Sequence, residues 1–223
     1  MNLPRMLATL VHAKLADRAP PLIVALCGWA DTGKSTVASP LCAELGQLGI
    51  SGFSISTDSF MKDRRERNAL GISGYNPRSI NSQALESAIL KFIAREPFAH
   101  HPYDNRVGTK QESPKVVAPG DVLVVEGIHA FDLVVAKQMQ LRIFFDSDEA
   151  TLRHMRYRAN IQKRDMKPAE AGARIEGEWQ DYCAFIRPLT SSADLIVQVD
   201  RHFNYKWPTD SGAPSESSKP TYT

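Results

Sequence analysis

Residues 28 to 35 have the residue types and the spacing of a loop that binds phosphate groups. The segment, Gly-Trp-Ala-Asp-Thr-Gly-Lys-Ser, fits G-x-x-x-x-G-K-[ST] without a mismatch. Its backbone N–H groups are expected to point at phosphate oxygens, with Lys34 reaching the β- and γ-phosphates and Ser35 offering its hydroxyl to Mg²⁺. Asp31 is unexpected here, because its carboxylate must point away from the phosphates. The residues predicted to bind a nucleotide are Gly28, Trp29, Ala30, Asp31, Thr32, Gly33, Lys34, Ser35 and Thr36.

Two acidic residues follow other strand-like apolar segments. Asp58 comes after Ser54-Ile55-Ser56-Thr57, and Glu126 comes directly after Val122 to Val125. In a parallel sheet the carboxyl ends of the strands share one edge, so both side chains are expected near the phosphate loop. Asp58 is then a candidate base for a hydroxyl that attacks the γ-phosphate, and Glu126 a candidate ligand of Mg²⁺. The alternatives are a helix cap for Asp58, and a helix cap or a solvated strand end for Glu126.

A segment with five cationic residues and no acid follows later in the chain. On one continuous helix, four of the five fall within an arc of about 100°, and Arg158 lies on another side. One face of such a helix is a cationic stripe with the charge to act on an anionic ligand of the phosphate loop. A solvated helix face is the alternative. The five residues are Arg153, Arg156, Arg158, Lys163 and Arg164.

The elements that must position these residues alternate between strands and helices. Continuous apolar runs of strand length predict a sheet that is covered on both faces, and the stretches between them are long enough for helices. The pattern predicts an α/β fold with a doubly wound, mostly parallel, five-stranded sheet that binds ligands at the carboxyl ends of its strands. The predicted strands are Leu22 to Leu26, Phe53 to Ile55, Val122 to Val125, Leu141 to Phe145 and Leu195 to Val199.

The flanking segments complete the expected organisation. Apolar residues at helical spacing predict an amphipathic helix within residues 1–19 that packs on the domain at 20–207. Within that domain, the polar stretch 97–119 predicts a β-hairpin insertion that covers a substrate, and 153–170 a lid. The Ser-, Thr- and Pro-rich segment 208–223 predicts a disordered tail.

Composition excludes several classes of function. Among 223 residues, 27 Lys and Arg against 25 Asp and Glu leave a net charge of +2, too small to predict a nucleic-acid or anionic-membrane partner. The longest apolar runs fall far short of the roughly 20 residues of a membrane span. Three cysteines without paired short spacing predict neither a disulfide framework nor a zinc site. We therefore expect a cytoplasmic protein with no nucleic-acid or membrane partner.

The chain resembles the uridine kinase and phosphoribulokinase group of small-molecule kinases over about residues 20 to 200. The resemblance implies a P-loop NTPase three-layer fold that uses ATP and Mg²⁺ to phosphorylate a hydroxyl of a small metabolite. Besides the phosphate loop and the arginine-rich segment, it rests on Thr57-Asp58-Ser59-Phe60, Pro102-Tyr103-Asp104, Val125-Glu126-Gly127-Ile128 and Phe145-Asp146-Ser147-Asp148, in the family's order.

The resemblance also implies roles for single residues. Asp58 matches the base, Glu126 matches the residue at the metal, and Tyr103 forms a wall of the acceptor pocket. Arg156 and Arg164 match lid arginines and join Lys34 in the predicted catalytic set. Homo-oligomers occur in this group, so a homo-oligomer is one candidate state of the chain.

The chain departs from uridine kinases on the acceptor side. Gly108 and Lys110 stand where those enzymes typically carry a His and an Arg that address the base and the substrate. Asn76-Pro77-Arg78 replaces a His-Pro-Asp whose Asp binds ribose hydroxyls. Arg78 is suited instead to hold a carboxylate or phosphate, with a solvated surface arginine as the alternative. Asp58, Arg78, Tyr103 and Lys110 are the predicted substrate residues.

Several interpretations remain open at this stage. Ala159-Asn160 replaces an Arg-Asp pair of the family lid, so either Arg158 substitutes after a local shift or the lid has fewer charges. Asp200 to Phe203 is a guess for the adenine pocket. The chain is expected to be a uridine kinase-like enzyme. The alternatives are a kinase for an anionic, non-nucleoside acceptor, a nucleotide-dependent switch, and a fold that has lost catalysis.

Overall fold

Five parallel strands form the centre of the fold in the computed structural model, which describes residues 2–207. The predicted tail at 208–223 lies outside the described residues. The strand order is β10-β9-β8-β1-β7-β2, so the five predicted strands are confirmed and a sixth short strand, β10, joins the edge antiparallel to β9. Its two residues carry no pattern from which sequence could predict a strand. The strands are β1 (Leu22–Gly28), β2 (Gly52–Ser56), β7 (Val122–Glu126), β8 (Leu141–Asp146), β9 (Leu195–Val199) and β10 (Tyr205–Lys206).

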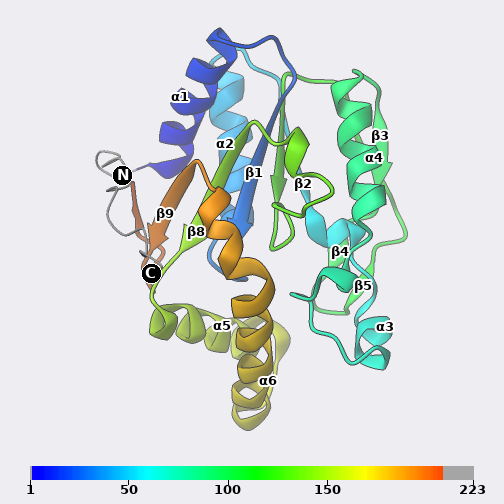
Figure 1. Cartoon of the computed structure of the whole chain (residues 1–223), viewed down its shortest axis with the longest axis vertical. Coiled ribbons are helices and arrows are strands. Elements are labelled where there is room, and N and C mark those ends of the chain that lie inside the picture. The colour runs from blue at the N-terminus through cyan, green and yellow to red at the C-terminus, as the bar shows by residue number, and fades with distance from the viewer. Residues whose placement is uncertain (1, 208–223) are drawn as a thin grey trace, which may run out of the picture.

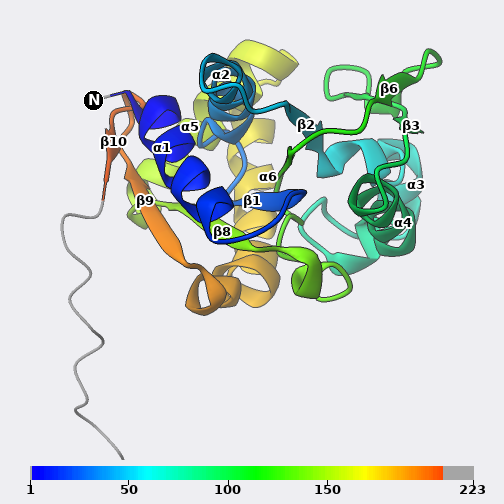
Figure 2. The same cartoon turned by 90° about the horizontal axis from the view of Figure 1, so that it is seen from above.

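Helices cover both faces of this sheet, as the α/β prediction requires. In the described part of the chain they are α1 (Leu3–Ala16), α2 (Lys34–Gln47), α3 (Arg64–Ala69), α4 (Ser82–Ile93), α5 (Glu149–Arg164) and α6 (Pro168–Asp181). Helices α1 and α2 lie together on one side of β1, β8 and β9 (Figure 2). Helices α5 and α6 extend past the lower end of the sheet in Figure 1, where the strands point.

Alternate residues of β1 enter two separate hydrophobic cores. Leu22 and Val24 pack with α1 and α2, whereas Ile23 and Ala25 pack with α4 and α6. This two-sided burial is why the strand is a continuous apolar run. Cysteines 27, 42 and 183 are all free, and no helix within 2–207 combines the length and apolarity of a membrane span.

Residues 97–119 form two short antiparallel ladders rather than one continuous hairpin. In the outer ladder β3 (Phe98–His100) pairs with β6 (Lys115–Val117), and in the tip β4 (Tyr103–Asp104) pairs with β5 (Thr109–Lys110). The tip is tied to α3, because Arg64 N–H donates to the Gly108 carbonyl over 2.8 Å. Gly108 has a φ of 90°, and a Cβ there would lie 2.8 Å from the Arg64 side chain. Glycine at 108 therefore lets the tip approach α3.

The predicted lid is two helices with a turn between them. Asp148 caps α5 by accepting a hydrogen bond from Thr151 N–H over 2.9 Å, and α5 ends at Asp165, which adopts a left-handed φ of 50°. Pro168 then opens α6 in the first turn, where its missing N–H costs nothing. The predicted segment 153–170 thus includes most of α5, the turn and the start of α6.

Candidate active site

A cavity of about 240 Å³ lies at the carboxyl ends of β1, β2 and β7. Its lining combines the phosphate loop with the ends of β2 and β7, α3, the hairpin tip, α5 and α6. Seven Lys or Arg and four Asp or Glu side chains give the lining a formal charge of +3. The predicted site residues that it brings together are Ala30, Asp31, Gly33, Lys34, Ser35, Thr36, Asp58, Tyr103, Glu126, Arg156 and Arg164.

The phosphate loop wraps around its own lysine. Lys34 Nζ donates to the carbonyl oxygens of Gly28 over 3.1 Å and Trp29 over 2.5 Å, and to the Thr32 hydroxyl over 3.3 Å. The ammonium group is buried, and burial lowers its pKa. Gly33 takes a left-handed φ of 87° immediately before α2 begins. The loop therefore directs a cation and a helix N-terminus into the cavity, the arrangement that binds phosphate.

Trp29 contributes its backbone to the loop, while its side chain faces away from the cavity. The ring is fully buried, stacks on Tyr75 at a centroid distance of 4.7 Å, and meets Trp179 edge-on at 5.4 Å. The Tyr75 hydroxyl accepts a hydrogen bond from Ala30 N–H over 3.3 Å. This aromatic cluster fixes the loop from behind and joins it to α6.

Asp58 lies in the 3₁₀ turn that follows β2, at the opposite wall of the cavity from the lid. Its carboxylate Oδ2 accepts a hydrogen bond from Asn105 Nδ2 over 3.1 Å. Asn105 comes from the hairpin tip, and its carbonyl accepts a hydrogen bond from Arg64. Within residues 2–207 no hydrogen bond reaches Oδ1 of Asp58. The carboxylate is thus oriented by the hairpin and keeps an oxygen that can accept a proton.

Glu126 ends β7 next to Ser56 of β2 in the sheet register. Burial raises the pKa of Glu126 and the Asp58 carboxylate raises it further, while Lys34 lowers it. No group of three or more His, Cys, Asp or Glu in the described chain is arranged to hold a metal by itself. The oxygen atoms of Glu126 and Ser35 nevertheless suit Mg²⁺, which takes few protein ligands and shares phosphate oxygens.

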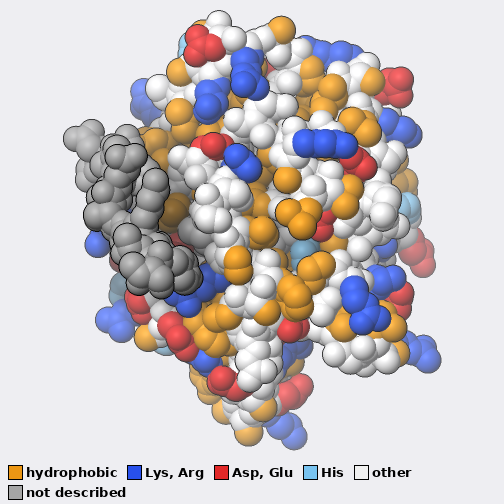
Figure 3. Space-filling model, in the orientation of Figure 1, with side chains coloured by type: hydrophobic (Ala, Val, Ile, Leu, Met, Phe, Trp, Pro, Cys, Tyr) orange, Lys and Arg blue, Asp and Glu red, His pale blue; other side chains and the backbone are white. Residues whose placement is uncertain are grey.

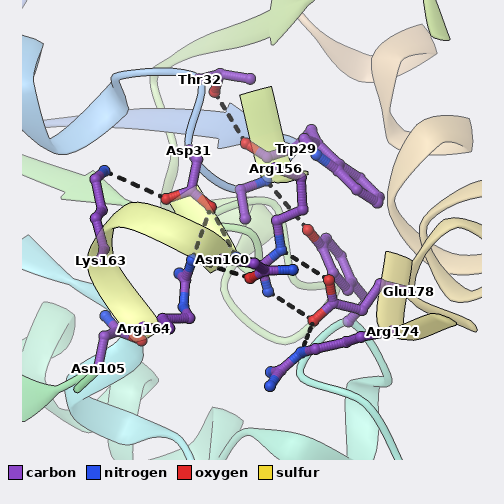
Figure 4. Close-up of polar contacts among 12 residues, drawn as sticks. Trp29, Asp31, Thr32, Asn105, Arg156, Asn160, Lys163, Arg164, Arg174 and Glu178 are labelled. Atoms are coloured by element: carbon purple, nitrogen blue, oxygen red, sulfur yellow. Dashed lines mark hydrogen bonds and ion pairs between the residues drawn. The ribbon is translucent and has the colours of Figure 1, made fainter. Parts of the chain in front are cut away.

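Asp31 directs its carboxylate at the lid, as Figure 4 shows. Oδ2 accepts from Arg156 Nη1 over 2.7 Å and from Arg164 Nη1 over 3.4 Å, and Oδ1 lies 3.4 Å from Lys163 Nζ. Burial would raise the pKa of Asp31, but the charges of Arg156 and Arg164 outweigh it and lower the pKa to about 2. The acid inside the phosphate loop is therefore the shared partner of three lid cations.

The predicted cationic face of α5 divides into two groups. Arg153 turns to the surface, where it pairs with Glu149 over 2.7 Å and with Glu176 of α6 over 2.8 Å. Arg158 is exposed and lies outside the cavity lining, so the lining does not support the alternative in which it replaces the missing family arginine. Of the α5 cations, the cavity lining contains the three that contact Asp31.

Three further arginines line the cavity, and none of them was among the residues predicted from the sequence. Arg64 donates to the carbonyls of Asn105 and Arg106, and Arg67 donates to the Lys62 carbonyl over 2.5 Å. The third, on α6, is Arg174, which pairs with Glu178 over 2.9 Å. Figure 3 shows Lys and Arg side chains gathered in the region of α3. The run Arg-Arg-Glu-Arg that starts α3 was the available signal.

Arg78 and Lys110 lie outside the cavity lining. Arg78 is exposed in the 3₁₀ turn Pro77–Ser79, whereas Ser79 of the same turn is buried and donates a hydrogen bond to the Gly74 carbonyl over 2.9 Å. Lys110 is exposed on β5, whereas Tyr103 on β4 reaches the cavity. The predicted contacts of Arg78 and Lys110 with a substrate therefore stay predictions, and the lining of the cavity does not support them.

An aromatic residue flanks the phosphate loop on the side away from Asp58. Phe203 lines the cavity with 46% of its surface exposed and adopts a left-handed φ of 62°. A Cβ added at Gly33 would lie 3.4 Å from Cδ1 of Phe203 and 2.1 Å from the hydroxyl of Tyr205. This segment overlaps the guess for the adenine pocket, and β10 holds it beside the loop.

The chain is similar to known small-molecule kinases in sequence and in fold. The model of the phosphoribulokinase / uridine kinase family matches residues 23–204. A uridine kinase of Leuconostoc citreum is 25% identical over 173 residues, which cover 76% of this chain and 79% of that protein.

Two solved structures are similar in fold. A putative fructose transport system kinase from Silicibacter sp. TM1040 has a TM-score of 0.73 at 20% identity and covers 86% of this chain and 98% of its own. A D-glycerate 3-kinase from Cryptococcus neoformans has a TM-score of 0.71 at 13% identity, with 91% of this chain and 97% of its own covered.

Proposed function

Because the chain belongs to the phosphoribulokinase and uridine kinase family, we propose that it transfers the γ-phosphate of ATP to a hydroxyl of a small anionic metabolite. Kinases of this family bind a nucleotide through the phosphate loop and phosphorylate hydroxyl groups. The observation that carries the finer proposal is one cavity whose lining includes Lys34 and Asp58 together with cations of α5 and the arginines of α3.

The phosphate-transfer roles follow from the contacts of each side chain. Lys34 and the loop N–H groups hold the β- and γ-phosphates, while Arg156 and Arg164 supply positive charge to the group in transit. Asp58 accepts the proton of the attacking hydroxyl at its free Oδ1. Asn105 keeps the carboxylate in place through Oδ2, which is a positioning role.

Glu126 and Ser35 would hold Mg²⁺ at the same edge of the sheet. The carboxylates of Glu126 and Asp58 are close enough that the charge of Asp58 helps to raise the pKa of Glu126. A cation between phosphate and Glu126 would offset this repulsion, so the residues present fit the ion. When bound, Mg²⁺ neutralises phosphate charge.

The nucleobase is assigned to the side of the cavity that carries Phe203. Its exposed ring beside Gly33 offers a flat apolar surface at the end of the loop opposite Asp58. Aromatic stacking is tolerant of base identity, so this wall alone does not select ATP over GTP.

The acceptor is assigned to the side that carries α3, and its charge follows from the partners of the arginines there. In residues 2–207 neither Arg64 nor Arg67 forms an ion pair with an acid, and both donate only to backbone carbonyls. Arg67 also lies over the ring of Tyr103 with 5.6 Å to the centroid. A guanidinium whose charge is not compensated by an acid favours a phosphate or carboxylate ligand.

ADP release with Mg-ATP against a panel of acceptors tests the proposal. The panel sets uridine and cytidine beside pantothenate, sugar phosphates and other hydroxylated anions, with Lys34→Ala as the blank. We expect stimulation by an anionic acceptor and none in the blank. Stimulation by nucleosides alone would overturn the anionic assignment, and silence from every acceptor with intact ATP binding would favour a nucleotide-dependent switch.

A further inference from the structure

The phosphate loop contains one carboxylate that faces its own lid. Asp31 has a side chain only 9% exposed, and the three cations that reach it all come from α5: Lys163 and Arg164 are its last two residues, and Arg156 lies about two turns before them. Two of these cations, Lys163 and Arg164, have no other acidic partner in the described part of the chain. Without Asp31 they would face the cavity as uncompensated charges.

The third cation, Arg156, is held differently. Its guanidinium also grips Glu178 of α6 through two hydrogen bonds, Nε over 2.7 Å and Nη2 over 2.6 Å. It is buried, and Glu178 fixes it whether or not Asp31 is charged. The lid cations therefore include one fixed member, Arg156, and two, Lys163 and Arg164, that pair with no acid other than Asp31 within residues 2–207 (Figure 4).

All of these groups line the cavity that receives the phosphates. Asp31, Lys34, Lys163 and Arg164 share that lining, so a triphosphate bound at Lys34 competes with the Asp31 carboxylate for the same cations. A carboxylate in the loop also repels the incoming anion. Both effects lower the affinity for phosphate, and the ion pairs of Asp31 keep α5 against the loop before any ligand binds.

We propose that Asp31 is an internal counter-ion that holds the lid over the phosphate loop and gives up Lys163 and Arg164 to the phosphates of the bound nucleotide. Asp31 is a positioning residue that sets the affinity for the nucleotide. Through its ion pairs, α5 already lies against the loop before the nucleotide binds. The proposal rests on the proposed function only in taking the loop as the phosphate site.

Asp31→Asn is the sharpest variant. Asn has nearly the shape of Asp and tolerates the left-handed φ of 62°, so the loop keeps its conformation. Binding of inorganic triphosphate, which lacks base and ribose, is measured by calorimetry at several salt concentrations. We expect binding to tighten about tenfold, with a steeper salt dependence, because one repulsive charge is gone and two cations are released. Equal or weaker binding overturns the proposal.

Glu176→Gln is the matched control. It likewise removes one negative charge from a salt bridge of α5, here between Arg153 and Glu176 of α6, but Glu176 lies outside the cavity lining. Triphosphate affinity should stay at the wild-type value in this variant. A tightening as large as that of Asp31→Asn would attribute the effect to general charge and overturn the proposal.

Hydrogen exchange of α5 gives a second readout that altered loop structure would not mimic. Without ligand, the amides of residues 149–164 should exchange faster in Asp31→Asn than in the wild type, and triphosphate should restore wild-type protection. Unchanged exchange without ligand overturns the role in holding the lid.

Lys34→Ala separates the two proposals. If this variant binds triphosphate normally, the assignment of the phosphate site itself is wrong. If only the Asp31→Asn result fails, the counter-ion role of Asp31 is wrong and the phosphate site stands.

Discussion

On the proposed nucleotide side of the cavity most of the lining residues come from one continuous segment, residues 28–36, whereas on the proposed acceptor side the lining residues come from α3, the hairpin tip and α6. The charges differ as well. Lid cations near the loop are compensated by Asp31 and Glu178, while Arg64 and Arg67 donate to backbone carbonyls. A triphosphate is the same ligand in every such kinase and can be bound by a local sequence motif. The acceptor differs between kinases and is contacted by residues that only the fold brings together.

Asp58→Asn removes the proposed base, which acts where the acceptor hydroxyl on one side meets the γ-phosphate on the other. The amide cannot accept the hydroxyl proton, so acceptor-dependent turnover should fall by about 10²-fold or more while ATP affinity stays within a few-fold. Steady-state kinetics and equilibrium ATP binding check both halves. Near-normal turnover would remove Asp58 from the mechanism.

Lowering the pH should reduce the stability contributed by charged groups on the nucleotide side, through Asp31, more than on the acceptor side. The pKa of Asp31 is lowered to about 2 in the folded chain, below its unfolded value of 3.8, so the stability that it contributes is present above pH 4 and lost as the pH falls toward 2. That contribution is about 2 kcal/mol at neutral pH. Urea unfolding of wild type and Asp31→Asn at several pH values should give curves that differ near pH 6 and converge near pH 2. A constant difference would contradict the ion pairs.

Arg64→Gln sharpens the comparison from the acceptor side. Loss of the charge should raise the KM for an anionic acceptor about tenfold, because a charge-assisted hydrogen bond contributes about 1.5–3 kcal/mol, and leave the KM for ATP unchanged. Arg65→Gln is the control, since the neighbouring arginine is exposed and outside the lining. Equal effects of the two variants, or a rise in the KM for ATP, would place the acceptor elsewhere.

The same difference explains what sequence could predict. The strands and the loop follow from apolar runs and a contiguous motif, and Asp58 and Glu126 follow from the rule that strand ends share an edge. Asn105 could not be found this way, because its contact with Asp58 depends on how the hairpin tip docks on α3. Arg78 was predicted as a substrate residue by matching family positions, which say nothing of the side on which a short turn leaves its side chain.

The partner of Asp31 illustrates the limit from the nucleotide side. Its sequence position showed that the carboxylate must avoid the phosphates, and the spacing of Arg156, Lys163 and Arg164 placed them on one face of a helix. The distance of 125 residues between Asp31 and Arg156 is closed only by the packing of α5 and α6 on the loop. Long-range ion pairs of this kind carry no local pattern.

Phe203→Ala tests whether the nucleotide side extends beyond the contiguous loop. The ring is exposed, so its removal should cost little stability but should raise the KM for ATP several-fold, since stacking on a base contributes about 1–3 kcal/mol. Phe203→Tyr retains the ring and should bind ATP normally, and inorganic triphosphate, which has no base, should bind both variants alike. If triphosphate binding weakens as much as ATP binding in Phe203→Ala, the residue acts through the loop at Gly33 rather than through the base, and the base wall must come from another element.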